Sequence, residues 1–216
     1  MEIYLIRHTT PAVEKGVCYG QADISVTASF LSEAEIIQQY LPGSFTAIYS
    51  SPLVRCSKLA QYLFANHSIQ LLDDLMEINC GEWELKIWND IPKTEIDPWM
   101  KDLLNVRIPG GESYTDVFER VMPCFKHIIE QQFLDRNDEK LPVDTIHLPR
   151  VAIVAHGGVI RSILSYITHT PLVDSFNVFS LHYGCVIKIV QQNNALMHEV
   201  LSNIAHEKET HKPTNL

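Results

Sequence analysis

The sequence has no long hydrophobic run, either at its start or in its interior. The first apolar stretch, residues 3–6, is interrupted by Arg7 after only a few positions. A secretory signal needs an apolar core of about 7–15 residues, and a membrane-spanning helix needs about 20 predominantly apolar residues. We therefore expect no signal peptide and no membrane partner, and the sequence predicts a cytoplasmic protein.

Cysteine and histidine patterns that hold disulfides or metals are also missing. The five cysteines are widely spaced and odd in number, with no CxxC pair, and no HExxH motif occurs among the 10 histidines. Disulfide scaffolds and zinc sites depend on such spacings. We expect reduced thiols, no metal and no other cofactor.

Positive charge is scarce. The 17 lysines and arginines face 26 aspartates and glutamates, so the formal net charge is −9. Such a balance argues against nucleic acid as a partner, because binding to phosphate backbones needs a basic surface. A small anionic substrate remains compatible with this charge, since a few local cations can outweigh a distant acidic surface. Nothing in the sequence indicates an oligomeric state.

What is present fits one globular domain. The chain has 216 residues, of which 46% are hydrophobic and 20% are charged, a balance typical of soluble proteins that bury a core. We expect a single domain over residues 1–206. Residues 135–150 are predicted to form a polar surface excursion, and residues 207–216 a polar, disordered tail.

Apolar segments alternate with helical patterns along the chain. Short, strongly apolar runs predict strands buried on both faces, at residues 3–6, 45–50, 151–155 and 185–190. Amphipathic patterns predict helices at residues 27–41, 51–65, 112–133 and 158–168. We expect Thr27 to cap the first helix, and Ser51 and Pro52 to begin the second. Alternation of this kind predicts an α/β fold with three α/β/α layers and a mostly parallel central sheet.

Two of the predicted strands run directly into histidine. Residues 3–6 lead to Arg7 and His8, and residues 151–155 lead to His156. In an open α/β sheet, ligands bind beyond the carboxyl ends of the strands, so both histidines are expected at the functional edge. Arg55 follows the second strand, and Glu77 follows the next apolar run.

These residue types suit the transfer of a phosphoryl group. Arginine binds phosphate oxygens with a planar, permanently charged fork, and a neutral imidazole can attack phosphorus to form a covalent intermediate. A nearby carboxylic acid can give the leaving oxygen its proton. The helix that follows Gly157 and Gly158 can also point its N-terminus at the phosphate.

Five motifs in order carry a family resemblance. The segments LIRHTTP, SSPLVRCSKLA, EINCGEWE, PGGES and VAHGGVIR span residues 5–161, and the chain resembles the histidine phosphatase (phosphoglycerate mutase-like) superfamily. The resemblance implies a metal-independent phosphatase for a small phosphorylated metabolite, with a phosphohistidine intermediate. It implies the following roles: His8 as nucleophile, Glu77 as general acid, and Arg7, Arg55, His156 and Gly157 as phosphate ligands.

The N-terminal segments RHTTP and CYGQAD look most like the alpha-ribazole phosphatase branch of cobalamin synthesis. The chain departs from the usual pattern at Thr9, which replaces a glycine, and at Glu14, which stands where many members carry a phosphate-contacting asparagine. Substrate specificity is expected in the loops at residues 9–26 and 80–110.

Several alternatives stay open on the sequence alone. One is a phosphoglycerate mutase or a sugar-bisphosphate phosphatase of the same superfamily, and another is a non-catalytic module that binds phosphate. Glu82 is a second candidate for the acid. Glu112 is a candidate for a substrate contact or for a carboxylate at a helix N-terminus.

Overall fold

The computed structural model describes residues 1–134, 148–192 and 195–205. One six-stranded sheet runs through the molecule in the order β3-β2-β4-β1-β5-β6. Its strands are β1 (Glu2–Arg7), β2 (Ala47–Ser50), β3 (Ile69–Leu71), β4 (Arg150–Ala155), β5 (Val186–Gln192) and β6 (Ala195–Ser202). The first four strands in this order are parallel, and β5 and β6 add an antiparallel edge. The predicted mostly parallel sheet is therefore confirmed.

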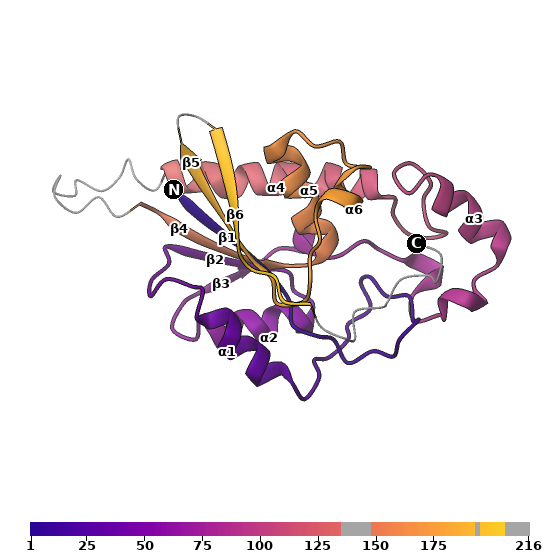
Figure 1. Cartoon of the computed structure of the whole chain (residues 1–216), viewed down its shortest axis with the longest axis horizontal. Helices are drawn as coiled ribbons and strands as arrows, with labels where there is room; N and C mark the ends of the chain where they lie inside the picture. Colours follow the sequence, from indigo (N-terminus) through magenta and orange to yellow (C-terminus); the bar gives the residue numbers. More distant parts are fainter. Residues whose placement is uncertain (135–147, 193–194, 206–216) are drawn as a thin grey trace, which may run out of the picture.

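Helices cover both faces of this sheet (Figure 1). The helices are α1 (Phe30–Gln38), α2 (Val54–Leu63), α3 (Lys93–Lys101), α4 (Tyr114–Leu134), α5 (Gly157–Thr168) and α6 (Ser175–Val178), of which α3 lies beyond the end of the sheet (Figure 1). On β1, Ile3 and Leu5 pack in the core cluster that α4 and α5 share, whereas Tyr4 and Ile6 pack against α1 and α2. Successive strand side chains point to opposite faces, so the apolar runs bury both faces and produce three layers.

The predicted starts of α1 and α2 are wrong. The first helix begins at Phe30, because the N–H and hydroxyl of Thr27 both bind the carbonyl of Thr10 instead of capping a helix. The second helix begins at Val54, and its first N–H donates to Asp23 at 2.7 Å. A carboxylate from a distant loop thus replaces the local cap expected at Ser51.

The other predictions of secondary structure were confirmed in part, and some of them fall on residues that the structure does not describe. The helices over 112–133 and 158–168 are confirmed as α4 and α5. The strand β6 was missed because its side chains are mostly exposed, so it carries no apolar run. Within the described residues, no helix combines the length and apolar character that a membrane span requires. Most of the predicted excursion, 135–147, and the tail lie outside the described residues.

Candidate active site

Adjacent strands bring the two predicted histidines together. The parallel register pairs Arg7 with Ala155, and the His8 N–H continues the ladder by donating to the Ala155 carbonyl at 3.1 Å. The rings of His8 and His156 lie 5.1 Å apart between centroids. Both histidines are buried, with 2% and 0% of their surfaces exposed. His8 and His156 therefore lie together beyond the carboxyl ends of β1 and β4, as predicted for an open α/β sheet.

The ring of His8 is fixed by its own neighbour in the chain. Its Nδ1 lies 2.7 Å from the backbone carbonyl oxygen of Thr9. A carbonyl can only accept, so Nδ1 carries the hydrogen and Nε2 keeps its lone pair. Burial lowers the pKa of His8 well below its ordinary value of 6.5, and the charges of Arg55 and Arg7 lower the pKa further. The ring is therefore neutral and nucleophilic at Nε2.

Both predicted arginines lie at this edge and are oriented by backbone oxygens. Arg55 is fully buried and donates to the carbonyls of Gly20 at 2.5 Å and Ala22 at 2.9 Å, while its Nε has no hydrogen-bond partner among the described residues. Arg7 donates to the carbonyl of Leu181. An arginine that is this buried needs an anion nearby, because an uncompensated charge is costly away from water.

His156 is held by the segment that follows β2. Its Nε2 lies 2.8 Å from the hydroxyl of Ser51 and 3.3 Å from the sulfur of Cys56. Burial, the Arg55 charge and the neighbouring His8 lower its pKa well below 6.5. A neutral His156 adds an N–H donor without adding charge, so the two arginines supply the positive charge of this group.

Glu77 reaches the same edge from an irregular segment after β3. One carboxylate oxygen accepts from the Ile78 N–H at 2.9 Å, and the other accepts from the Gly158 N–H at 3.1 Å. A side chain on residue 158 would clash with this carboxylate, since a Cβ there would lie 2.2 Å from a Glu77 oxygen. A Cβ on Gly157 would make ordinary contact with Arg7. The N-terminus of α5 thus lies against both Glu77 and Arg7.

The alternative carboxylates lie in other environments. Glu82 is exposed. Glu112 accepts hydrogen bonds from the Arg120 side chain at 2.8 and 3.0 Å and from the Asn79 N–H at 2.8 Å. Arg120 in turn donates to the Glu77 carbonyl at 2.9 Å. Glu112 is therefore placed to orient the segment that carries Glu77, a role that its sequence motif alone did not indicate.

Two tyrosines that the sequence reasoning left out lie against the arginines. The hydroxyls of Tyr19 and Tyr183 are 2.6 Å apart. The Arg7 guanidinium carbon lies 4.1 Å from the Tyr183 ring centroid, and that of Arg55 lies 5.5 Å from the Tyr19 ring centroid. Tyr183 is also 5.4 Å from His8 between ring centroids. In the sequence, only the position of Tyr183 before the last apolar run indicated that a tyrosine lies near the site.

The loop at residues 80–110 is packed around aromatic residues. Trp83, Trp88 and Trp99 contact one another, with ring centroids 5.5–6.2 Å apart, and the Trp83 indole donates to Glu95 at 2.9 Å. The tryptophans therefore pack against one another within this loop. All five cysteines are free and buried.

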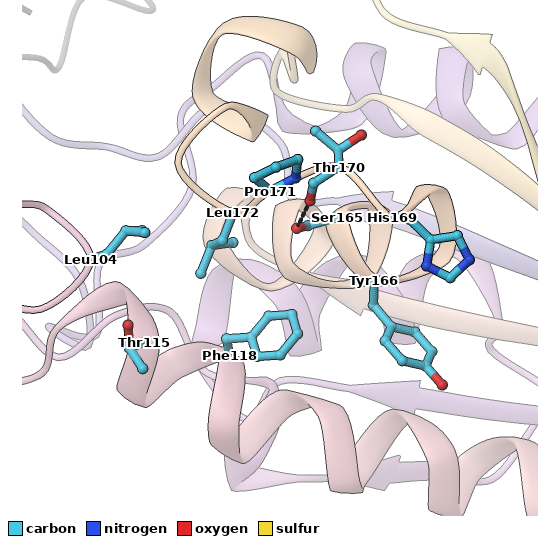
Figure 2. A pocket seen from close by; sticks show the side chains of 9 residues that line it. All are labelled: Leu104, Thr115, Phe118, Ser165, Tyr166, His169, Thr170, Pro171 and Leu172. Carbon is cyan, nitrogen blue, oxygen red and sulfur yellow. Dashed lines mark hydrogen bonds between the residues drawn. The ribbon is translucent and has the colours of Figure 1, made fainter.

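A hollow lies away from these residues. A groove of about 450 Å³ lies between α4, α5 and the turn that follows α5, and Figure 2 shows the side chains that line it. Its lining is mostly apolar or weakly polar: Leu104, Thr115, Phe118, Ser165, Tyr166, His169, Thr170, Pro171 and Leu172. None of the predicted site residues lines it. Across the described part of the chain, no group of three or more histidine, cysteine, aspartate or glutamate side chains is placed to hold a metal ion.

Comparisons with known proteins identify the family of this chain. A family model for the histidine phosphatase superfamily (branch 1) matches residues 3–203. A Hydrogenobacter thermophilus protein named as a candidate phosphoserine phosphatase is 26% identical over 215 residues, which cover 96% of this chain and 98% of that protein.

Solved structures show the same fold. The alpha-ribazole phosphatase of Shigella flexneri superimposes with a TM-score of 0.78 at 20% identity, over 96% of this chain and 100% of that chain. The phosphoserine phosphatase of Entamoeba histolytica superimposes with a TM-score of 0.72 at 20% identity, over 93% and 96% of the two chains. The match to the family model extends over nearly the whole described chain, and the protein therefore belongs to the histidine phosphatase superfamily, branch 1.

Proposed function

We propose that this phosphatase hydrolyses small phosphate monoesters through a transient phosphohistidine on His8. His8 carries the proposal, because its Nδ1 is tied to a carbonyl 2.7 Å away and its Nε2 is left with the lone pair. Burial and two arginines keep the ring unprotonated. A neutral, oriented imidazole beside fixed cations is what attack on a phosphate dianion requires.

The first step forms one bond and breaks another. Nε2 of His8 attacks phosphorus, the ester P–O bond breaks, and Glu77 gives its proton to the leaving oxygen. Arg7, Arg55 and His156 bind the three remaining phosphoryl oxygens, with the N-terminus of α5 at Gly157 adding backbone donors. Fixed donors of this kind stabilise the charge that develops in the transition state.

In the second step water releases the phosphate. The ionised Glu77 takes a proton from a water molecule, whose oxygen attacks phosphorus as the bond to His8 breaks. Inorganic phosphate leaves, and His8 recovers its lone pair while Glu77 is protonated again. Because His8 and Arg55 are buried, substrate entry and phosphate exit need movement of the covering side chains, among them Tyr19 and Tyr183.

Alpha-ribazole 5′-phosphate is the first substrate that we propose to test. The support is the structural likeness to the Shigella flexneri phosphatase and the N-terminal segments RHTTP and CYGQAD. Phosphoserine is the matched alternative, because the relative from Hydrogenobacter thermophilus carries that name. Release of inorganic phosphate from the two compounds under equal conditions ranks them. A cytoplasmic location is part of this proposal.

Trapping the phosphoenzyme tests the mechanism. Enzyme quenched during turnover of a radiolabelled monoester should carry an acid-labile, base-stable phosphoryl group on His8. His8→Ala should lose turnover on the order of 10⁶-fold, the scale seen when an enzyme loses its nucleophile, and should keep its fold by circular dichroism. His127→Ala, an exposed histidine on α4, is the matched control. Label on another residue, or turnover by the His8 variant, would contradict the proposal.

A further inference from the structure

We infer that Glu84 is a positioning residue that sets the phosphate-binding geometry of Arg55 through the backbone of residues 20–22. The inference rests on the proposed function, since it names a group that prepares one of the proposed phosphate ligands. Glu84 is half-buried and lies at the end of the EINCGEWE segment. Its carboxylate binds the loop of residues 20–22 on the side opposite to Arg55.

The carboxylate of Glu84 collects four backbone N–H groups. One oxygen accepts from Gln21 at 2.7 Å and from Cys80 at 3.0 Å. The other oxygen accepts from Gly20 at 2.9 Å and from Ala22 at 3.1 Å. Hydrogen bonds to a charged acceptor are stronger than those between neutral groups. Three successive N–H groups of one loop therefore point at a single anionic side chain.

The same loop turns its carbonyls toward Arg55. The oxygens of Gly20 and Ala22 accept from the two terminal nitrogens of the guanidinium, at 2.5 and 2.9 Å. A planar fork that is held at both ends cannot rotate. The Nε of Arg55, which is buried without a hydrogen-bond partner among the described residues, is then left in a fixed direction for a phosphate oxygen.

Two further contacts show that the loop has little freedom to adopt another position. A Cβ on residue 20 would lie 1.8 Å from the Ile78 carbonyl oxygen, so only glycine lets the loop approach the segment before Glu84. Asp23, the next residue after the loop, binds the first N–H of α2 at 2.7 Å. That helix carries Arg55 as its second residue. The loop therefore controls both the guanidinium and the start of its helix.

Charge connects the two ends of this arrangement. The peptide group between Gly20 and Gln21 presents its N–H to the Glu84 anion and its carbonyl to the Arg55 cation, so each charge aligns the dipole that binds the other. Neutralising Glu84 weakens the four N–H contacts, and an amide in its place brings hydrogens toward backbone N–H groups that need an acceptor. The carbonyls of Gly20 and Ala22 are then free to move, and Arg55 loses its orientation.

A double-mutant cycle tests this connection. Glu84→Gln should lower kcat/KM for p-nitrophenyl phosphate by about tenfold to a hundredfold, the size expected for a lost charge-assisted network. In an Arg55→Ala background, the same change should cost less than about twofold, because the residue that it positions is absent. Glu82→Gln, an exposed carboxylate in the same segment, should stay within about twofold of wild type.

Chemical rescue supplies a second readout that a purely structural role would not move. Guanidinium ion added to Arg55→Ala should restore part of the activity, since the carbonyls of Gly20 and Ala22 remain in place to bind it. Guanidinium should not rescue the double variant Arg55→Ala/Glu84→Gln. Glu84→Asp, which keeps the charge, should lose less than Glu84→Gln, and it replaces Glu84→Gln in the cycle if that variant does not fold.

The outcomes separate this inference from the proposed function. Three results would each overturn the positioning role. The first is a kcat/KM loss in the double variant equal to the product of the two single losses. The second is equal guanidinium rescue of Arg55→Ala and the double variant, and the third is unchanged kcat/KM in Glu84→Gln. Those results leave the phosphohistidine on wild-type His8 intact. Absence of a phosphohistidine in the wild-type enzyme would instead overturn the proposed function.

Discussion

The two sides of the site are built in different ways. On the side that we propose to bind phosphate, called the phosphate side, Arg7, His8 and His156 stand at the ends of β1 and β4, whose backbones are locked in register. On the side of the proposed acid, called the acid side, Glu77 lies half-buried in an irregular segment and depends on Gly158 and Arg120 for its position. Regular backbone hydrogen bonding fixes His8, whereas hydrogen bonds between side chains and backbone groups of distant segments fix Glu77. We expect the two sides to respond differently to substitution.

The largest difference should appear when the acid is removed. Glu77→Gln should slow phosphorylation of the enzyme by an alkyl phosphate by about 10²–10⁴-fold, the range of general acid catalysis. Phosphorylation by p-nitrophenyl phosphate should change far less, because its leaving group hardly needs a proton. Rapid-quench measurement of the first step checks this, with Glu82→Gln as the matched control. Equal losses for both esters would mean that Glu77 only shapes the site.

Removing a phosphate ligand should affect all substrates alike. Arg55→Ala should lower kcat about 10²–10³-fold, or about 3–4 kcal/mol, for the alkyl and the aryl ester, because the arginine stabilises the phosphoryl group common to both. Steady-state kinetics on both esters provide the measurement. Lys58→Ala removes an exposed cation from the next turn of α2 and serves as the control. A change in KM alone would show that Arg55 binds substrate without stabilising the transition state.

A smaller, selective loss is expected from the residue that holds the acid segment. Arg120 donates to the carbonyls of Asp74, Met76 and Glu77 at 2.8–2.9 Å. Arg120→Lys loses the fork and should slow the alkyl ester about tenfold, with the aryl ester nearly unaffected. Arg107→Lys, a largely exposed residue, is the control. A uniform loss on both esters would place the effect of Arg120 outside the acid side.

The smallest effect concerns stability on the phosphate side. Burial and Arg55 lower the pKa of both His8 and His156 below 6.5. Below that pH the unfolded chain binds two protons that the native site resists, so stability should fall as pH drops from 6.5 toward the lowered native values. Each histidine contributes a slope of at most about 1.4 kcal/mol per pH unit, and this slope disappears within about one pH unit above 6.5.

Urea unfolding between about pH 5 and 8 measures this slope. His8→Asn should make the slope shallower, because one of the two buried imidazoles is gone. His127→Asn should leave it unchanged, since that side chain is exposed in the native state. An unchanged slope in the His8 variant would mean that the His8 pKa is not lowered by folding.

Chelation should change nothing. In the proposed mechanism, Arg7 and Arg55 supply the positive charge that a metal would otherwise bring to the phosphate, so we expect full activity in EDTA. Assays of p-nitrophenyl phosphate hydrolysis before and after dialysis against the chelator check this. Loss of activity that returns with added metal would contradict the metal-independent mechanism on both sides of the site.

The difference between the two sides also explains which features could be foreseen. The apolar runs at residues 3–6 and 151–155 predict buried strands, and parallel strands end at one edge, so His8 and His156 could be paired from the sequence. Glu84 and Arg120 carry no such periodic signal. Their partners are backbone groups up to 64 residues away in the chain.

Sequence alone determined the three layers, the mostly parallel sheet and the edge at which the reactive groups meet, because strand burial and connection rules depend on local patterns of apolar residues. Only the tertiary structure decided where α1 and α2 begin, since Thr10 and Asp23 compete for the groups that a local cap would use. It also decided how Arg55 is oriented, through carbonyls that Glu84 holds from the opposite side. Hydrogen bonds between distant segments have no fixed spacing in the chain, so their partners become known only once the chain has folded.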